Sequence, residues 1–441
     1  MPRICFILVA GLDRNLAAAG GGIFASFAQR AIIRPITPAV TCSMQATLTT
    51  GATPAQHGIV GNGLYTYNNP AIQQCLDTDS FLEFRRQISF WEQANSLLQT
   101  PRFWTGKPLR TAMLFWQQSM PDAADLVLTP KPEHTPDGQT IASCFSRPRD
   151  LYRRLSDKLG AFPLHQYWGP LAALPSSQWI INAAMEVWRN DPVDLQMVYV
   201  PHLDYNLQRL GPDHPTVAKD AAAVAALLEP LVVMVRAVGG IPIIAGDYSM
   251  HAVSKVVFPN RALRDAGLLR TRPDENGKLL IDFTASRAVA MVDHQIAFIY
   301  CAADAVPQTQ EVLQTLDGTG LLAVIEKEKA RLGLHTPRAG QIIALARSDA
   351  WFAHDWWHQD SEKPRWQFSV DIHRKPGYDP RELFFDPVHQ CIAQDTALVR
   401  GSHGVVGPDA EKQPVLLCDI PVPDQHVKAT DMAEWLLRLA R

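Results

Sequence analysis

The chain has 441 residues, of which 47% are hydrophobic, so it can bury a large core in one α/β domain with an insertion or in two to three domains. The formal net charge of −3 is small, which argues against a nucleic acid polymer or a membrane surface as the partner. The seven cysteines include no C-x-x-C pair, a pattern typical of reduced thiols, and this predicts a cytoplasmic protein. The longest apolar stretch, residues 221–238, contains Glu229, Pro230 and Arg236 and is therefore not expected to span a membrane.

Short apolar runs alternate with helical patterns along the first part of the chain. Residues 4–9 are interpreted as a first core strand, because the run is too short for a signal peptide and no cleavage site follows it. Helices are expected at residues 16–30, 43–50, 177–190 and 431–439, and strands at 195–200 and 241–245. A helix at 215–238, stopped by Gly239 and Gly240, joins these two strands into a βαβ unit. The alternation predicts an α/β fold with a mostly parallel central sheet covered by helices on both faces.

The pattern changes between residues 254 and 345. A stretch rich in Arg and Asn is followed by a strand in HQIAFIYC, a helix in QEVLQTLD, a further αβ piece and a strand in QIIALA. We interpret this segment as a small α+β subdomain inserted into the core. The core domain then consists of residues 1–253 and, after the chain returns, residues 346–441.

Two aspartates follow strands of the βαβ unit. Asp204 comes four residues after one strand and Asp247 two residues after the other. Ligands bind beyond the carboxyl ends of the strands in an open parallel sheet, so both carboxylates are expected in one crevice. A single aspartate after a strand is often only a turn former or a helix cap. The pair favours a metal or catalytic site.

The segment TPAVTCSMQATLTTGATPAQHGIVGN places Thr41 at the expected start of a short helix. Because a helix N-terminus favours an anion, the Thr41 hydroxyl could attack a phosphoryl group held there. The alternative is that Thr41 is only an N-cap. Asn62 lies in a Gly-rich turn a few residues on, where its amide could reach the same anion.

Four segments together resemble the type I phosphodiesterase and nucleotide pyrophosphatase family of the alkaline phosphatase superfamily, including its phosphonoacetate hydrolase-like members. They are the Thr41 segment above, YVPHLDYNLQRLGPDHP, IIAGDYSMHAV and VRGSHGVVG, and their order and spacing match over the whole core. The resemblance implies an alkaline-phosphatase-like sandwich with a small inserted subdomain. It implies Thr41 as the nucleophile and Asn62 as a donor to a phosphate oxygen. Asp204 and His403 then match two ligands of one metal ion, and Asp247 matches one ligand of the other.

Three of the six metal ligands that the family uses are replaced. The Asp-Gly pair after the first strand is Ala10-Gly11 here, the His four residues after Asp204 is Gln208, and the Asp-His pair is Asp247-Tyr248. Gln208 could still offer a carbonyl oxygen to a hard cation, although glutamine is a poor ligand for zinc. Asp13 could replace the missing first aspartate if the loop after the strand shifts.

A second group of chemically active residue types lies in SVDIHRKPGYDPRELFFDP, residues 369–387. Asp371 and His373 are two positions apart, so both face one side of an extended segment and could serve as replacement metal ligands. Arg374 and Lys375 could instead hold a phosphate group or supply the positive charge of a missing ion. The simpler alternative is a surface loop stabilised by its own ion pairs.

The first hypothesis is a metal-assisted hydrolase that cleaves a phosphodiester, pyrophosphate or phosphonate bond in a small molecule with Thr41 as the nucleophile. Its cofactor would be a divalent metal, either zinc or manganese or magnesium, and the lost ligands favour one ion rather than two. The alternative is a diverged, non-hydrolytic protein that binds an anionic small molecule without a full two-metal site. The sequence leaves the substrate and the oligomeric state open.

Overall fold

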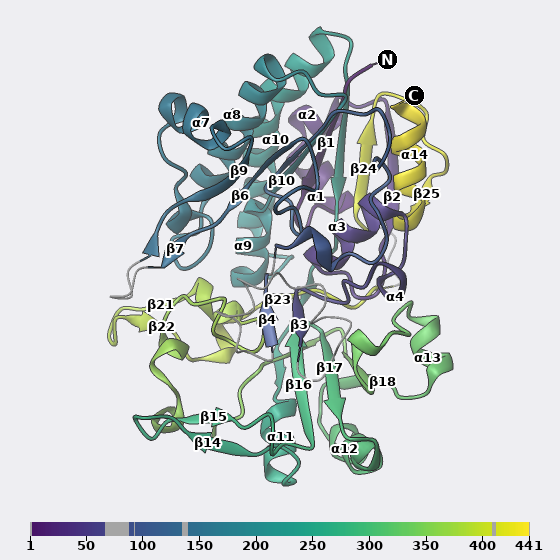
Figure 1. The fold of residues 1–441 in the computed structure, drawn as a ribbon. Coiled ribbons are helices and arrows are strands. Elements are labelled where there is room, and N and C mark those ends of the chain that lie inside the picture. The colour runs from purple at the N-terminus through teal and green to yellow at the C-terminus, as the bar shows by residue number, and fades with distance from the viewer. Residues whose placement is uncertain (1, 67–87, 92, 135–139, 408–411, 441) are drawn as a thin grey trace.

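The structure, a computed structural model, describes residues 2–66, 88–91, 93–134, 140–407 and 412–440. Figure 1 shows two halves: a large sheet with long helices in the upper half, and a smaller sheet in the lower half. Nine strands form the large sheet, in the order β25-β2-β24-β11-β1-β10-β5-β6-β9. They are β1 (Ile4–Val9), β2 (Gln29–Arg34), β5 (Thr111–Leu114), β6 (Leu126–Pro130), β9 (Cys144–Arg147), β10 (Leu195–Val200), β11 (Ile241–Gly246), β24 (Val415–Cys418) and β25 (His426–Lys428).

The large sheet is mostly parallel, as predicted. Strands β11, β1, β10, β5 and β6 run parallel to one another, and β2 runs parallel to β25. Strand β24 is antiparallel to β11 and β2, and β9 is antiparallel to β6. Parallel strands of this kind place their carboxyl ends along one edge, which is where a ligand site forms.

Helices cover the large sheet in two groups. In one group α10 packs against α1, α2, α8 and α9, and in the other α3 packs against α4 and α14. Their bounds are α1 (Arg14–Gly20), α2 (Gly22–Ala25), α3 (Thr41–Thr50), α4 (Pro54–His57), α7 (Leu151–Leu159), α8 (Leu174–Asn190), α9 (His202–Leu210), α10 (Pro215–Ala237) and α14 (Met432–Leu439). The predicted α/β class is confirmed.

Burial on both faces explains why the central strands are almost entirely apolar, with Gln196 of β10 as a polar exception. Every residue of β1 and β10 is buried, because helices cover both faces of a parallel sheet. The predicted bounds of β1 and β10 are confirmed, and β11 extends one residue beyond its prediction to Gly246. Helix α10 ends at Ala237, just before the predicted Gly239-Gly240 stop.

The single helix predicted at residues 16–30 is wrong. The chain instead forms α1, which ends at Gly20, then the short α2, and then strand β2 from Gln29. Gly21 and Gly22 have φ angles of 55° and 49°, which lie outside the right-handed helical region. Glycine adopts such angles without a steric penalty, so the Gly20–Gly22 run breaks the helix and turns the chain towards β2.

The lower half is built on an antiparallel sheet in the order β16-β17-β19-β18. Its elements are β13 (Lys255–Val257), α11 (Pro259–Asp265), β14 (Thr271–Pro273), β15 (Leu279–Ile281), β16 (Ala288–Asp293), β17 (Ile296–Cys301), α12 (Val306–Gln314), β18 (Thr319–Ala323), α13 (Glu326–Arg331), β19 (Ile342–Ala346) and β20 (Ala350–Phe352). Its hydrophobic core also takes in Phe352, Trp357 and Tyr378, which lie beyond residue 345. The chain rejoins the large sheet at β24.

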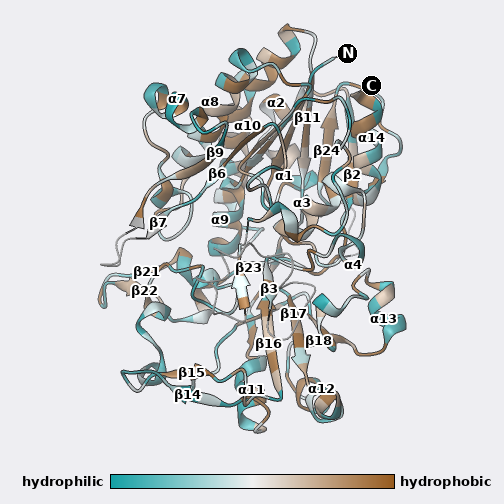
Figure 2. Cartoon of the chain, viewed as in Figure 1, coloured by the Kyte–Doolittle hydropathy of each residue, from teal (hydrophilic) through white to brown (hydrophobic). Residues whose placement is uncertain are grey.

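Hydropathy follows this two-core arrangement. In Figure 2 the strands of the large sheet are mostly brown, whereas α13 at the surface carries teal positions. The two sheets belong to separate clusters of buried hydrophobic residues. Within the described residues, no helix combines the length and the apolar character that crossing a bilayer requires.

Candidate active site

Thr41 is the first residue of α3 and is 3% exposed. The N-cap position belongs to Val40, which has an extended backbone, so the Thr41 hydroxyl does not serve as the cap of its own helix. The phenols of Tyr199 and Tyr248 lie beside this hydroxyl; burial raises the pKa of both, and the hydroxyl lowers each pKa by less. The partial positive charge of the α3 N-terminus lies beside the same hydroxyl. An anion bound at this helix N-terminus would therefore lie next to the Thr41 hydroxyl.

Asn62 completes the start of α3 from outside the helix. Its Oδ1 accepts a hydrogen bond from the Cys42 main-chain N–H at 2.9 Å. Its own N–H and its Nδ2 donate to the two carboxylate oxygens of Asp293, at 2.7 and 3.0 Å. Burial raises the pKa of Asp293 to about 7, against the opposing effect of the Asn62 hydrogen bonds. Asn62 therefore fixes the helix N-terminus relative to the end of β16.

Asp204 lies in the first turn of α9 and both of its carboxylate oxygens accept hydrogen bonds. Gln208 Nε2 donates to Oδ2 at 2.5 Å, and the Tyr248 hydroxyl donates to Oδ1 at 3.0 Å. Burial raises the pKa of Asp204 to about 6, although these two bonds and the charge of Arg209 oppose the rise. Gln208 thus presents its NH2 group, and not its carbonyl, to the aspartate.

Asp247 follows β11 and ties the ends of two strands together. Its Oδ1 accepts main-chain N–H groups of Gly11 and Tyr248, each at 3.0 Å. Its Oδ2 is buried without a hydrogen-bond partner. Burial, with the nearby Asp204 as a further cause, raises the pKa of Asp247 well above its usual value.

His403 follows β23 (Gly401–Ser402) and lies flat against Tyr248. Its Nδ1 donates to the Ala39 carbonyl at 2.8 Å, and burial lowers its pKa to about 3. The imidazole is therefore neutral at neutral pH, and its Nε2 carries a lone pair. The rings of His403 and Tyr248 are stacked, with centroids 3.6 Å apart and planes 2° from parallel.

A single cavity of about 500 Å³ brings several of these side chains together. The side chains that line it include those of Thr41, Asp204, Tyr248 and His403. Asp247 is the residue immediately before Tyr248 in the sequence. Aromatic side chains form much of the remaining wall, and they are Trp91, Tyr167, Trp168, Tyr199, Tyr205 and Tyr378. The volume falls in the range of small-molecule sites, about 300–1,000 Å³.

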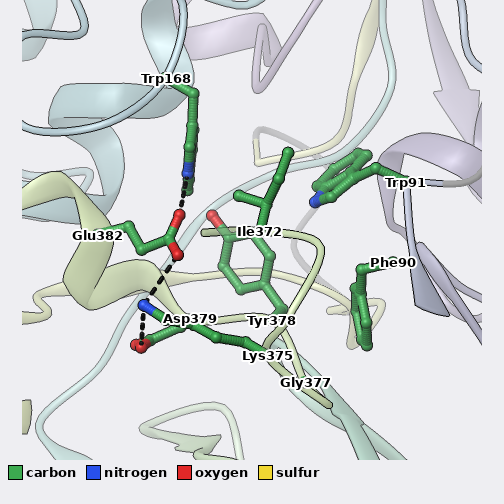
Figure 3. Close-up of a pocket in the computed structure, with 9 residues that line it drawn as sticks. All are labelled: Phe90, Trp91, Trp168, Ile372, Lys375, Gly377, Tyr378, Asp379 and Glu382. Atoms are coloured by element: carbon green, nitrogen blue, oxygen red, sulfur yellow. Dashed lines mark hydrogen bonds and ion pairs between the residues drawn. The ribbon is translucent and has the colours of Figure 1, made fainter. Parts of the chain in front are cut away.

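The predicted 369–387 cluster is only partly at this cavity. Asp371, His373 and Arg374 line it, and Arg374 is half-exposed and paired with Asp371 at 2.8 Å. Lys375 is instead fully buried beside a separate small pocket, where its ammonium group contacts Asp379 at 3.1 Å and Glu382 at 2.8 Å. Figure 3 shows Glu382 between the Lys375 ammonium and the Trp168 indole. Two carboxylates thus already neutralise Lys375, which does not line the cavity that contains Thr41.

The residues present do not fit the two-metal centre that the resemblance implies. Both oxygens of Asp204 are already bonded to Gln208 and Tyr248, and Asp247 Oδ1 is bonded to main-chain N–H groups. Across the part of the chain that the structure describes, no three His, Cys, Asp or Glu side chains are grouped as metal ligands. Asp13, the suggested substitute, caps α1 by accepting from the Leu16 N–H. No chemical step is therefore assigned to a metal.

Three residues of the site escaped the sequence interpretation. Tyr199 reaches Thr41 from β10, where it reads as one residue of a buried strand. His294 and Tyr378 stack with centroids 3.7 Å apart. The available signal for His294 was its place in a polar D-H-Q turn between two strands, which reads equally well as structural.

The fold and these residues define a member of the alkaline phosphatase superfamily. The sequence model of the type I phosphodiesterase/nucleotide pyrophosphatase family matches residues 24–379 of the chain. The chain therefore belongs to this family of hydrolytic enzymes. No curated protein matches its sequence.

Two solved structures illustrate the similarity of fold. Murine ectonucleotide pyrophosphatase/phosphodiesterase 5 is 14% identical, with a TM-score of 0.59 over 99% of this chain and 95% of that one. Phosphonoacetate hydrolase from Sinorhizobium meliloti 1021, in complex with phosphonoformate, is also 14% identical, with a TM-score of 0.60 over 100% of this chain and 96% of that one. These similarities confirm the alkaline-phosphatase-like fold.

Proposed function

We propose that the cavity binds a small organic phosphate or phosphonate and that Thr41 attacks its phosphorus atom. The observation that carries this proposal is the position of Thr41. Its hydroxyl lies at the N-terminus of a ten-residue helix, in the wall of a cavity of about 500 Å³, beside two phenols. The murine relative solved in complex with AMP is an inactive form in which a threonine is replaced by alanine. A nucleotide-sized molecule fits a cavity of this volume.

The reaction needs a bond from the Thr41 oxygen to phosphorus as the bond to the leaving group breaks. The leaving group departs with the electron pair, and the Thr41 proton passes to the neighbouring Tyr248 hydroxyl, whose own proton moves to Asp204 along the hydrogen bond between them. Water then cleaves the phosphothreonine, releases the product and restores the hydroxyl. The α3 N-terminus stabilises negative charge that develops on the phosphoryl oxygens.

Removing the Thr41 hydroxyl and measuring phosphodiester hydrolysis tests this proposal. Thr41→Ala should lower the turnover of bis(p-nitrophenyl) phosphate by about a thousandfold or more, roughly 4 kcal/mol of barrier, while Thr41→Ser keeps a hydroxyl and measurable turnover. Thr50→Ala is the matched control, because Thr50 is on the same helix and its hydroxyl bonds the Ala46 carbonyl. Equal activity in wild type and Thr41→Ala would reject Thr41 as the nucleophile.

A second candidate function is binding without hydrolysis. The specific observation in its favour is that hydrogen-bond donors already satisfy both oxygens of Asp204. On this alternative the wild-type protein would bind AMP in calorimetry, Thr41→Ala would bind it equally well, and neither would turn over a nitrophenyl ester. Measurable wild-type turnover that disappears in Thr41→Ala would exclude it.

A further inference from the structure

Six buried side chains close into a ring at the floor of the cavity. In order they are Asp204, Tyr248, His403, His294, Tyr378 and Gln208, and they are called the Asp204 ring below. Each of the six is at most 8% exposed. Three of the six contacts are hydrogen bonds, and three are contacts between rings, of which two are stacked and one is tilted by 38°. Each member therefore contacts two others.

The hydrogen bonds form one side of the ring. Asp204 accepts from Tyr248 and from Gln208, as described above. The Tyr378 hydroxyl donates to Gln208 Oε1 at 2.8 Å. The Gln208 amide therefore donates on one side and accepts on the other, and this arrangement fixes its orientation. A carboxylate between two donors is well satisfied in a buried position.

The aromatic rings form the other side. Tyr248 lies against His403, His403 lies 3.7 Å from His294, and His294 lies 3.7 Å from Tyr378, measured between ring centroids. Two phenol rings thus enclose two imidazoles. His294 has a φ of 59°, a conformation that persists in a non-glycine residue only when its surroundings hold it.

The ring joins the two halves of the molecule. Asp204 and Gln208 come from α9 and Tyr248 follows β11, and Figure 2 shows both elements in the upper half. His294 lies in the turn between β16 and β17, and Tyr378 belongs to the core of the lower half. In the family, by the resemblance, the positions of Gln208 and Tyr248 carry histidine ligands. Here both residues instead direct donors at Asp204.

We propose that the Asp204 ring takes the place of the metal ion that the family binds between the positions of Asp204 and His403, so that the chain builds this part of its cavity without a divalent cation. A cation and a set of hydrogen-bond donors solve the same problem, because each satisfies carboxylate oxygens that have been removed from water. The donors do this without adding a net charge. Unlike an ion, they are part of the chain and cannot dissociate.

This inference does not depend on Thr41 chemistry. It concerns what holds the cavity together, and it is measured by metal content and stability with no substrate present. A failure of the Thr41 proposal would leave those measurements unchanged. Conversely, a firmly bound ion at the acids would overturn the ring proposal and leave the role of Thr41 open to its own test.

The first experiment measures metal in the wild-type protein. The protein is incubated with zinc or manganese, dialysed, and measured by plasma mass spectrometry and by thermal melting with and without EDTA. We expect well under one equivalent of metal and no change in melting temperature with EDTA. About one equivalent or more of an ion that is lost in Asp204→Asn or Asp247→Asn, with melting lowered by EDTA, would overturn the proposal.

The second experiment restores the family ligands. The triple variant Ala10→Asp, Gln208→His, Tyr248→His removes two ring members and should gain zinc binding in calorimetry with zinc alone. Tyr248→Phe is the matched control, because it removes one donor and adds no ligand, so it should bind no zinc. A folded triple variant that binds no more zinc than the wild type would overturn the idea that the ring stands in the place of the ion. If the triple variant does not fold, the wild-type metal measurement decides.

Discussion

Replacing Arg381 by methionine should destabilise the protein strongly. Arg381 is 1% exposed, and its Nε donates to Asp379 at 2.7 Å. Its two Nη atoms donate to Asp355 at 3.1 and 2.6 Å. Methionine keeps much of the bulk but removes the charge, so two buried carboxylates lose a shared partner. Removing one side of a buried ion pair costs about 3–5 kcal/mol, because the remaining charge is left in a medium of low polarity.

Arg347→Met provides the matched control. Arg347 also pairs with a carboxylate, Asp317, at 2.6 Å, but the two side chains are 44% and 71% exposed. Exposed pairs contribute about 0–1 kcal/mol because water and salt screen them. Urea unfolding followed by tryptophan fluorescence should therefore show a small loss for Arg347→Met and a large one for Arg381→Met.

Two further measurements sharpen the comparison. Added salt should weaken the Arg347 pair and leave the buried Arg381 pair almost unchanged. The double variant Arg381→Met, Asp355→Asn should lose less stability than the sum of the single variants, because it removes the unpaired charge. Losses of similar size for Arg381→Met and Arg347→Met would refute the reasoning, since burial would then have no effect on the strength of the pair.

Three more predictions follow from the same geometry. Tyr378→Phe should lower the free energy of unfolding by about 1–3 kcal/mol, because the buried Gln208 carbonyl loses its donor; an unchanged urea midpoint would contradict the ring contact. Burial alone would raise the pKa of Asp355, but the Arg381 charge outweighs it and holds the pKa at about 2. This depressed pKa stabilises the fold above the unfolded value of about 3.9, so between about pH 5 and pH 2 the wild type should lose about 2 kcal/mol more unfolding free energy than Asp355→Asn does. If the free energy of unfolding fell by the same amount in both proteins as the pH is lowered, that pKa would be contradicted. Gly404→Ala should cost roughly 1–3 kcal/mol, because its φ is 121° and a Cβ there would lie 3.3 Å from a main-chain nitrogen; thermal melting measures the loss, and unaltered melting would contradict it.

Continuous apolar runs made the central strands predictable from sequence. Strands β1 and β10 are buried on both faces, and a run of six residues between turn signals is short for a helix and typical of a strand. The helix expected at residues 16–30 failed because three glycines lie inside an otherwise helical pattern. The positive φ angles of Gly21 and Gly22 depend on how the chain must turn, which the apolar pattern does not record.

The floor of the cavity was harder to predict than the fold. Thr41, Asp204 and Asp247 stand at the ends of elements, where the position in the sheet predicts a shared edge. His294 and Tyr378 belong to segments with no such rule, and their contacts join residues 109 and 170 positions apart in the chain. In the sequence, two of the three replaced ligands, Gln208 and Tyr248, appear only as positions where a metal-binding histidine is missing. Only their directions in space show that both became donors to Asp204.

Through the hydrogen bonds between Asn62 and Asp293, the upper half of the molecule depends on the lower half for the position of one of its helices. Asp293 ends β16 in the smaller sheet, and it orients the side chain that caps the helix bearing Thr41. Trimming the protein to its large sheet would thus remove a support from the helix itself. Replacing the smaller sheet and its helices by those of a relative would succeed only if the relative also carries a carboxylate at the position of Asp293.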